Sequence, residues 1–188
     1  MSDPDPIPKT SSDKVIVDIL VKSHSWSSVD FNIHEHCNKI MEMVVSNTLC
    51  ELKNNKTIEV SLLLADDKIL NDLNKEYRNK DKATNVLSFP FHKNSLEEIK
   101  INYKKNNHLF LGDIAISFER IIYESLEQEK VFLEYFSYIL IHGLLHLLGY
   151  DHIEDKDAEI MEELEINIMK QMGFNHKHSS LQLPNEIV

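Results

Sequence analysis

The sequence is poor in cysteine, with only Cys37 and Cys50 among its 188 residues. Both lie in a segment whose apolar residues recur with helical spacing, and a continuous helix would hold their sulfurs roughly 20 Å apart. A disulfide needs its two sulfurs in direct contact, so no bridge is expected. The absence of a disulfide is typical of a reducing compartment.

Features of export and of membrane insertion are also missing. Residues 1–13 contain neither the basic start nor the apolar stretch of a secretory signal. No apolar run reaches the roughly 18 to 20 residues that a membrane-spanning helix needs. The most apolar segment, residues 131–150, is interrupted by Glu134, His142 and His146. We therefore expect a cytoplasmic protein without a membrane partner, in which residues 1–13 form a flexible leader.

Basic residues are outnumbered. Lysine and arginine total 20 against 31 aspartates and glutamates, which gives a net charge of -11 at pH 7. Because counterion release from a polyanion requires a basic surface, this balance argues against indiscriminate nucleic-acid binding, and no DNA partner is expected. The net charge does not exclude a local basic patch. The densest basic cluster before residue 100 is Lys75, Arg78, Lys80 and Lys82.

No internal repeat or linker divides the chain, whose length suits one ordinary core. We predict a single domain over 14–174 and a C-terminal tail over 175–188. The periodicity of apolar residues predicts strands near 14–21, 56–65, 85–91 and 108–117, and helices near 31–52, 66–78, 118–128, 131–148 and 156–172. Strands and helices do not alternate strictly along the chain, so we predict the α+β class, with helices packed on a small mixed β-sheet. Pro90 predicts that its strand ends or lies at a sheet edge.

The stretch "HGLLHLLGYDH" contains three histidines and two glycines. His142 and His146 are four positions apart on a predicted helix, so both side chains emerge on one face and can reach a single metal ion. His152 would lie roughly 9 Å further along a continued helix, out of reach. Gly149 can end the helix in a left-handed conformation and turn His152 back toward the pair.

Three histidine nitrogens would leave the fourth position of a tetrahedral ion open, which is typical of a catalytic zinc site. The alternative is a group of hydrogen-bonded core histidines. Burying three unpartnered imidazoles beside Leu144, Leu145 and Leu147 would be costly, so we expect one bound Zn²⁺ ion. Nickel and copper also accept imidazole ligands, and the metal stays open.

The spacing of the histidines also matches the zinc-binding helix of metzincin proteases. In those enzymes a glutamate follows the first histidine and acts as the general base. Here Gly143 occupies that position and has no side chain that can move a proton. We therefore do not expect peptide hydrolysis by the metzincin route.

The same stretch resembles the signature of the YbeY family of bacterial metal-dependent endoribonucleases. Residues 73–91 ("LNKEYRNKDKATNVLSFPF") and 111–117 ("LGDIAIS") resemble the family as well, and the resemblance extends from about Val15 to Phe174. Ala83 departs from it, because the family usually has proline there.

This resemblance implies single-strand-specific cleavage of RNA, in ribosomal RNA maturation (including the 3′ end of 16S rRNA) and in ribosome quality control. The implied partners are single-stranded RNA, ribosomal RNA and the ribosome. The resemblance places zinc on His142, His146 and His152, includes His142 in the catalytic site, and assigns the family's functionally important arginine to Arg78.

Physical chemistry agrees with a role for Arg78, since a guanidinium is always charged and can grip a phosphate through two hydrogen bonds. The alternative is a solvated cation at a helix end. Asp151 could orient a histidine or cap the turn. Ser88 and Asn85 could contact RNA along the edge strand or serve the strand end, and Asp113 could brace the fold or touch the site.

Two other functions stay open at this point. A zinc metalloprotease-like hydrolase would fit the histidine spacing but not Gly143. A non-enzymatic ribosome assembly factor would use its zinc for structure only. For an endoribonuclease, the sequence does not distinguish attack by water from attack by the neighbouring 2′-hydroxyl.

Overall fold

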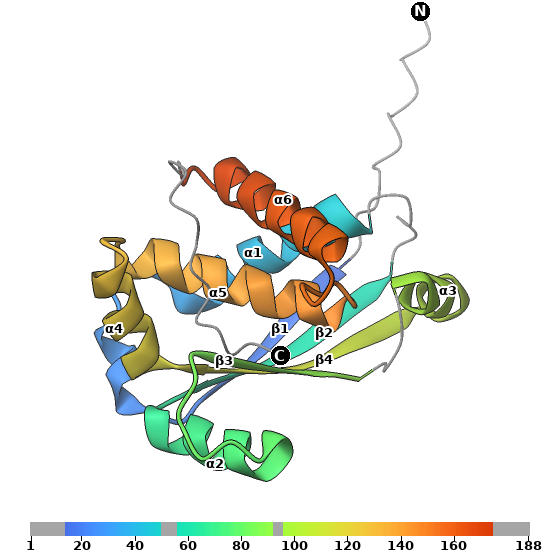
Figure 1. Cartoon of the computed structure of the whole chain (residues 1–188). Helices are drawn as coiled ribbons and strands as arrows, with labels where there is room; N and C mark the ends of the chain where they lie inside the picture. Colours follow the sequence, from blue (N-terminus) through green and yellow to red (C-terminus); the bar gives the residue numbers. More distant parts are fainter. Residues whose placement is uncertain (1–13, 50–55, 92–95, 175–188) are drawn as a thin grey trace, which may run out of the picture.

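A mixed sheet is the frame of the computed structural model, which describes residues 14–49, 56–91 and 96–174 (Figure 1). In spatial order β1-β2-β4-β3, its strands are β1 (Lys14–Val21), β2 (Thr57–Ala65), β4 (His108–Ser117) and β3 (Val86–Pro90). β1, β2 and β4 are parallel, whereas β3 is antiparallel to β4. The predicted mixed sheet is confirmed. The predicted leader and tail lie outside the described residues.

Helices cover both faces of this sheet unequally. α1, α5 and α6 lie on one face and α2 on the other, which is the predicted α+β arrangement (Figure 1). In the part of the chain that the structure describes, no helix is long and apolar enough to cross a bilayer. The helices are a 3₁₀ helix η1 (His24–Ser28), α1 (Ile33–Thr48), α2 (Asp67–Arg78), α3 (Leu96–Lys105), α4 (Phe118–Glu127), α5 (Phe132–Leu147) and α6 (Asp155–Gln171).

The main core lies between the sheet and the three helices on one face. On β2 the residues alternate, and Ile58, Val60, Leu62 and Leu64 are buried toward this core. α5 is buried on nearly every side, as its continuous apolar sequence predicts, because it also packs against α1 and α6. This burial places the first two histidines of the predicted site on a rigid element.

A smaller apolar cluster lies on the opposite face, where α2 packs over the carboxyl ends of β2 and β4. The N-cap of α2 is Asp66, whose carboxylate accepts the backbone N–H of Ile69 (2.9 Å). It ends before Asn79, which has a left-handed backbone (φ 57°). The cluster consists of Ala65, Leu70, Leu87 and Ala115, with Leu63, Ile69, Leu73 and Phe89 packed against it.

β3 is an edge strand of the described sheet and ends at Pro90, as predicted. A proline at this place breaks no ladder, because its missing N–H would face away from a partner. The short 3₁₀ helix η1 was not predicted, and two α-helices differ from the prediction. α1 ends at Thr48 rather than near residue 52, and α3 was not predicted, because its short segment has few apolar residues. Cys50 lies outside the described residues, so the predicted lack of a disulfide stays a prediction.

Candidate metal centre

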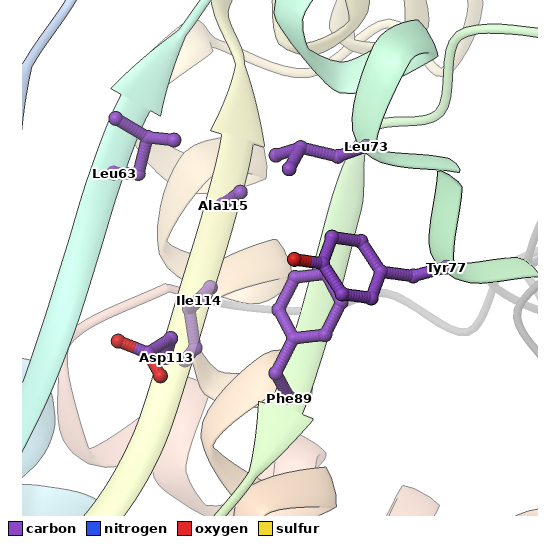
Figure 2. A pocket seen from close by; sticks show the side chains of 7 residues that line it. All are labelled: Leu63, Leu73, Tyr77, Phe89, Asp113, Ile114 and Ala115. Carbon is purple, nitrogen blue, oxygen red and sulfur yellow. The ribbon is translucent and has the colours of Figure 1, made fainter. Parts of the chain in front are cut away.

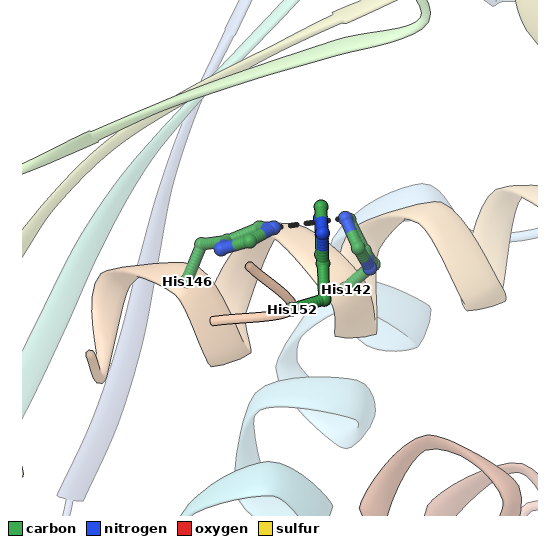
Figure 3. Close-up of side chains that lie close together, drawn as sticks. All are labelled: His142, His146 and His152. Carbon is green, nitrogen blue, oxygen red and sulfur yellow. Dashed lines mark hydrogen bonds between the residues drawn. The ribbon is translucent and has the colours of Figure 1, made fainter. Parts of the chain in front are cut away.

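The three histidines of the "HGLLHLLGYDH" stretch converge on one point (Figure 3). One ring nitrogen of each lies within 4.8 Å of the other two. The ring centroids of His142 and His146 are 4.5 Å apart, and that of His152 lies 5.6 Å from the first and 5.1 Å from the second. In the described part of the chain, this is the only group of potential ligands found so close together.

A helix-ending turn brings His152 back. Gly149 has a left-handed backbone (φ 86°) directly after α5. Its N–H donates to the carbonyl of His146 (3.0 Å), and the N–H of Tyr150 donates to the carbonyl of Leu145 (3.1 Å). These two bonds form a Schellman motif, which satisfies the last carbonyls of the helix and reverses the chain. This is the turn that the spacing of the three histidines predicts.

Asp151 stabilises the segment that follows. Its carboxylate accepts the backbone N–H groups of His152 (2.6 Å) and Ile153 (3.1 Å). Of the two roles considered for Asp151, the structure shows the cap of the turn. The imidazole of His152 is therefore positioned by its backbone.

The other ring nitrogens of the first two histidines are already engaged. Nδ1 of His142 lies 2.7 Å from a carboxylate oxygen of Glu165 on α6. Nδ1 of His146 lies 3.1 Å from the carbonyl of Tyr150, which can only accept, so this Nδ1 carries the proton. Such contacts fix the tautomer that leaves Nε2 free to bind a metal.

The inward-facing nitrogens fit a metal ion. Nε2 of His142 and Nε2 of His146 are only 2.9 Å apart. If both Nδ1 atoms donate, the lone pairs of the two Nε2 atoms face each other and repel. A cation between them removes this repulsion. Nε2 of His152 is buried and has no hydrogen-bond partner among the described residues. A buried polar atom without a partner is costly, and a metal would satisfy it.

Burial keeps the imidazoles of His142 and His146 neutral. The pKa of His142 is lowered to about 3, mainly by burial and to a smaller extent by the neighbouring His152. Burial likewise lowers the pKa of His146 to about 3, with His142 and His152 as smaller causes. Burial also raises the pKa of Glu165 to about 8. A neutral imidazole is the form that binds a metal ion.

Gly143 has a packing role that its neighbours reveal. A Cβ atom added there would lie 3.1 Å from the hydroxyl oxygen of Ser88 and 3.3 Å from a methyl group of Val86. The Ser88 hydroxyl donates to the Gly143 carbonyl (3.1 Å) and ties α5 to β3. A side chain at this position would therefore crowd β3, and the chain has no counterpart of the glutamate that a metzincin has here.

The remaining predicted residues lie outside the histidine group. Asn85 is only 1% exposed, and its amide donates to Glu124 (2.9 Å) and accepts from the N–H of Val86 (2.7 Å). Of the two roles considered for Asn85, its burial and these two hydrogen bonds fit the strand-end role. Arg78 ends α2 on the other side of the sheet (Figure 1) and makes no hydrogen bond or ion pair with any residue that the structure describes.

Sequence reasoning missed two groups that orient the histidines. Glu165 lies on the apolar stripe of α6, four residues after Met161 and three before Ile168, and is 4% exposed. A carboxylate on an otherwise buried stripe is a signal that could have identified it. The carbonyl of Tyr150 offers no such signal, because any residue has one.

Comparison with known proteins agrees with this geometry. A family model described as Endoribonuclease YbeY matches residues 23–173. An Endoribonuclease YbeY of Rhizobium leguminosarum bv. trifolii is 44% identical over 128 residues, which cover 68% of this chain and 71% of that protein. One from Sinorhizobium fredii is 36% identical over 162 residues, covering 85% and 89%.

A solution structure of a Thermotoga maritima protein has the same fold, with a TM-score of 0.54 at 22% identity over 83% of this chain and 88% of that one. The fold and the site thus define a small α+β protein with a three-histidine group suited to a metal ion. With the family model matching residues 23–173, the chain belongs to the YbeY family.

Proposed function

We propose that this chain is a zinc-dependent endoribonuclease that cleaves single-stranded RNA during ribosomal RNA maturation, with activity carried by one domain over 14–174. Its relatives bear the name Endoribonuclease YbeY. The proposal rests on one observation: a ring nitrogen from each of His142, His146 and His152 lies within 4.8 Å of the other two. The proposal places the chain in the cytoplasm, with ribosomal RNA and the ribosome as partners.

The three histidines would hold one Zn²⁺ ion through their inward-facing nitrogens. When bound, such an ion lowers the pKa of a water ligand toward about 7 and polarises a phosphoryl oxygen. Glu165 and the Tyr150 carbonyl hold two of the rings in the required tautomer. The apolar surroundings of α5 exclude bulk water from the ligand nitrogens. None of the three rings is available as a general base, because each would be a ligand.

Arg78 would bind a phosphate of the same RNA strand. Its guanidinium can form two parallel hydrogen bonds with one phosphate, an arrangement that lysine cannot reproduce. Of the two cations in the last turn of α2, Lys75 pairs with Asp81 (2.6 Å), whereas Arg78 has no partner among the described residues.

A peptidase is not favoured, because Gly143 has no side chain that could act as the general base of a metzincin. A purely structural zinc is not favoured either, because the relatives are named as enzymes.

Elemental analysis of protein purified without a histidine tag identifies the bound metal, and the activity test then uses that protein loaded with zinc. We expect cleavage of unstructured RNA, no cleavage of unstructured peptide, and loss of activity in His146→Ala. Peptide cleavage that His146→Ala abolishes would overturn the proposal. Analysis of the RNA ends separates the two routes, since a 2′,3′-cyclic phosphate indicates attack by the 2′-hydroxyl.

Arg78→Ala tests the phosphate contact. The variant should keep its fold and its metal content, because Arg78 has no partner among the described residues. RNA cleavage should fall roughly 100- to 1000-fold if the phosphate that Arg78 holds is the one on which charge develops. Arg78→Lys should recover only part of it. Unchanged cleavage by Arg78→Ala would show that this role is wrong.

A further inference from the structure

The sheet face opposite to α5 carries a pocket of about 380 Å³ (Figure 2). This volume lies within the range of about 300 to 1,000 Å³ that small-ligand sites occupy. α2 covers only one end of this face, so the pocket opens along β3 and β4. Its lining residues are Leu63, Leu73, Tyr77, Phe89, Asp113, Ile114 and Ala115.

One exposed aromatic pair lines this pocket, and a second lies further along the same two strands. The rings of Tyr77 and Phe89 meet edge to face with centroids 5.2 Å apart, and Tyr77 is 60% exposed. In Figure 2 the Tyr77 hydroxyl points from α2 toward β4. The rings of Phe91 and Phe110 form a second edge-to-face pair at 5.5 Å, and Phe91 is 65% exposed. Exposed rings on a sheet are surfaces on which nucleobases stack.

The register of the sheet places both pairs on the same face. Phe110 is the partner of Glu59 on β2, and Glu59 alternates with the buried residues of that strand, as Leu63 of the pocket does. Parallel partners point to the same side, so Phe110 shares the face of Leu63. Phe91 lies against Phe110. We call Tyr77, Phe89, Phe91 and Phe110 the aromatic platform.

The charges around the platform suit one strand of RNA. Asp113 lines the pocket, is exposed, and has no hydrogen bond or ion pair with another described residue. Its carboxylate can accept N–H groups from a base edge. Arg78 follows Tyr77 directly and would attract phosphates while repelling a basic peptide. Asp18 on β1 and Glu59 on β2 are acidic and would repel phosphates. The RNA strand is therefore confined to β3, β4 and α2.

β3 connects the platform to the histidine group. Ser88 faces α5 and donates to the carbonyl of Gly143, the neighbour of His142. The next residue, Phe89, faces the pocket on the other side of the sheet. Because β3 is an edge strand of the described sheet, an RNA strand that passes over this edge can touch both faces.

We propose that the aromatic platform binds single-stranded RNA beside the cleavage point and that the pocket holds one base, with guanine preferred. This inference rests on the proposed function and gives the same strand a second contact region. Guanine offers two adjacent N–H donors to the single carboxylate of Asp113, whereas uracil offers one. Stacking on the aromatic rings supplies the affinity, and Asp113 supplies the preference.

The test is fluorescence anisotropy with the full-length, metal-loaded protein and labelled octanucleotides. The oligomers carry 2′-O-methyl groups, and a gel confirms that they stay intact. We expect a guanine-containing oligomer to bind more tightly than the one in which uracil replaces guanine. Tyr77→Ala should weaken binding roughly 5- to 100-fold, the loss expected for one stacked base. Asp113→Asn should reduce the preference for guanine.

Tyr123→Ala is the matched control, because Tyr123 on α4 is 56% exposed and lies outside the platform. It should bind RNA as the unmodified protein does. Phe91→Ala, at the second aromatic pair, should also weaken binding. The proposal is wrong if Tyr77→Ala and Phe91→Ala both bind with unchanged affinity. It is also wrong if an arginine-rich peptide displaces the RNA and needs Asp113 to bind, which would identify a peptide site.

The two proposals can fail separately. If Tyr77→Ala and Phe91→Ala bind RNA normally while His146→Ala abolishes cleavage, the platform is wrong and the endoribonuclease stands. If the unmodified protein binds RNA through the platform but cleaves none, the proposed function is wrong and the platform stands.

Discussion

At the scale of single residues, the histidine group depends on atoms that face away from its centre. Nδ1 of His142 contacts Glu165, and Nδ1 of His146 contacts the carbonyl of Tyr150. Both contacts leave Nε2 directed toward the group, where Nε2 of His152 has no hydrogen-bond partner within the described part of the chain. The hydrogen-bond pattern thus prepares three acceptors for one cation.

Glu165→Gln should weaken zinc binding roughly 10- to 100-fold, the usual effect of losing a carboxylate partner of a ligand histidine. The amide keeps the volume of the side chain but not its negative charge. Competition with a chelator of known affinity measures the change. Glu163→Gln is the control, because Glu163 lies on the same helix and is exposed. Equal affinity in both variants would show that Glu165 does not support the site.

The sequence predicts the three histidines well, because their spacing and one glycine already require them to meet. It does not reveal their partners. Glu165 comes from α6, a separate element, and its contact with His142 depends on how α6 packs against α5. For Asn85 the sequence left an RNA contact and a strand-end role open, and the burial of its side chain is seen only in the folded structure.

At the scale of elements, the turn after α5 and the contact between α5 and β3 determine the shape of the site. Gly149 permits the turn, and Gly143 permits the close approach of the helix to the strand. The continuous apolar run over 131–148 predicts α5 almost to the residue, because this helix is apolar on every side. α3 escaped prediction because only Ile99 and Tyr103 of its ten residues are buried.

Gly149→Ala should lower the free energy of unfolding by about 1 to 2 kcal/mol, the cost of a left-handed conformation for a residue with a Cβ atom. Zinc affinity should fall with it, because His152 follows the turn. Gly149→Asn should recover part of both losses, since asparagine tolerates this conformation. Chemical denaturation and zinc competition provide the two measurements. Unchanged zinc affinity in Gly149→Ala would show that the metal site does not depend on this turn.

Gly143→Ala tests the contact between α5 and β3. Alanine favours the helix by about 1 kcal/mol, but its Cβ would crowd Ser88 and Val86, and overpacking costs about 1 to 3 kcal/mol. We expect a net loss of about 1 kcal/mol of unfolding free energy by chemical denaturation. In a Ser88→Ala background the loss should shrink, because the nearest contact atom is gone. An identical loss in both backgrounds would contradict the contact.

At the scale of the whole molecule, an acidic protein is proposed to bind a polyanion. The net charge is -11, and most of the lysines and arginines are dispersed along the chain. Binding must therefore use few phosphates and draw much of its affinity from stacked bases. Neither composition nor periodicity predicts such a surface, because α2, β3 and β4 come together only in the folded sheet.

The affinity for single-stranded RNA should accordingly depend weakly on salt. A single-strand contact contributes a slope of about -0.7 per phosphate in a plot of log affinity against log salt concentration. We expect a total slope of about -1 to -3, made shallower by about 0.7 in Arg78→Ala. Anisotropy titrations at several potassium concentrations measure it. An unchanged slope in Arg78→Ala would show that this residue holds no phosphate.

The most direct test of the account is the zinc stoichiometry and affinity of tag-free protein with and without its last histidine. The unmodified chain should bind one zinc ion, His152→Ala should bind it at least tenfold more weakly, and His34→Ala, which changes an exposed histidine, should match the unmodified chain. A His152→Ala variant that keeps full affinity, or an unmodified chain that binds no metal, would contradict the three-nitrogen site.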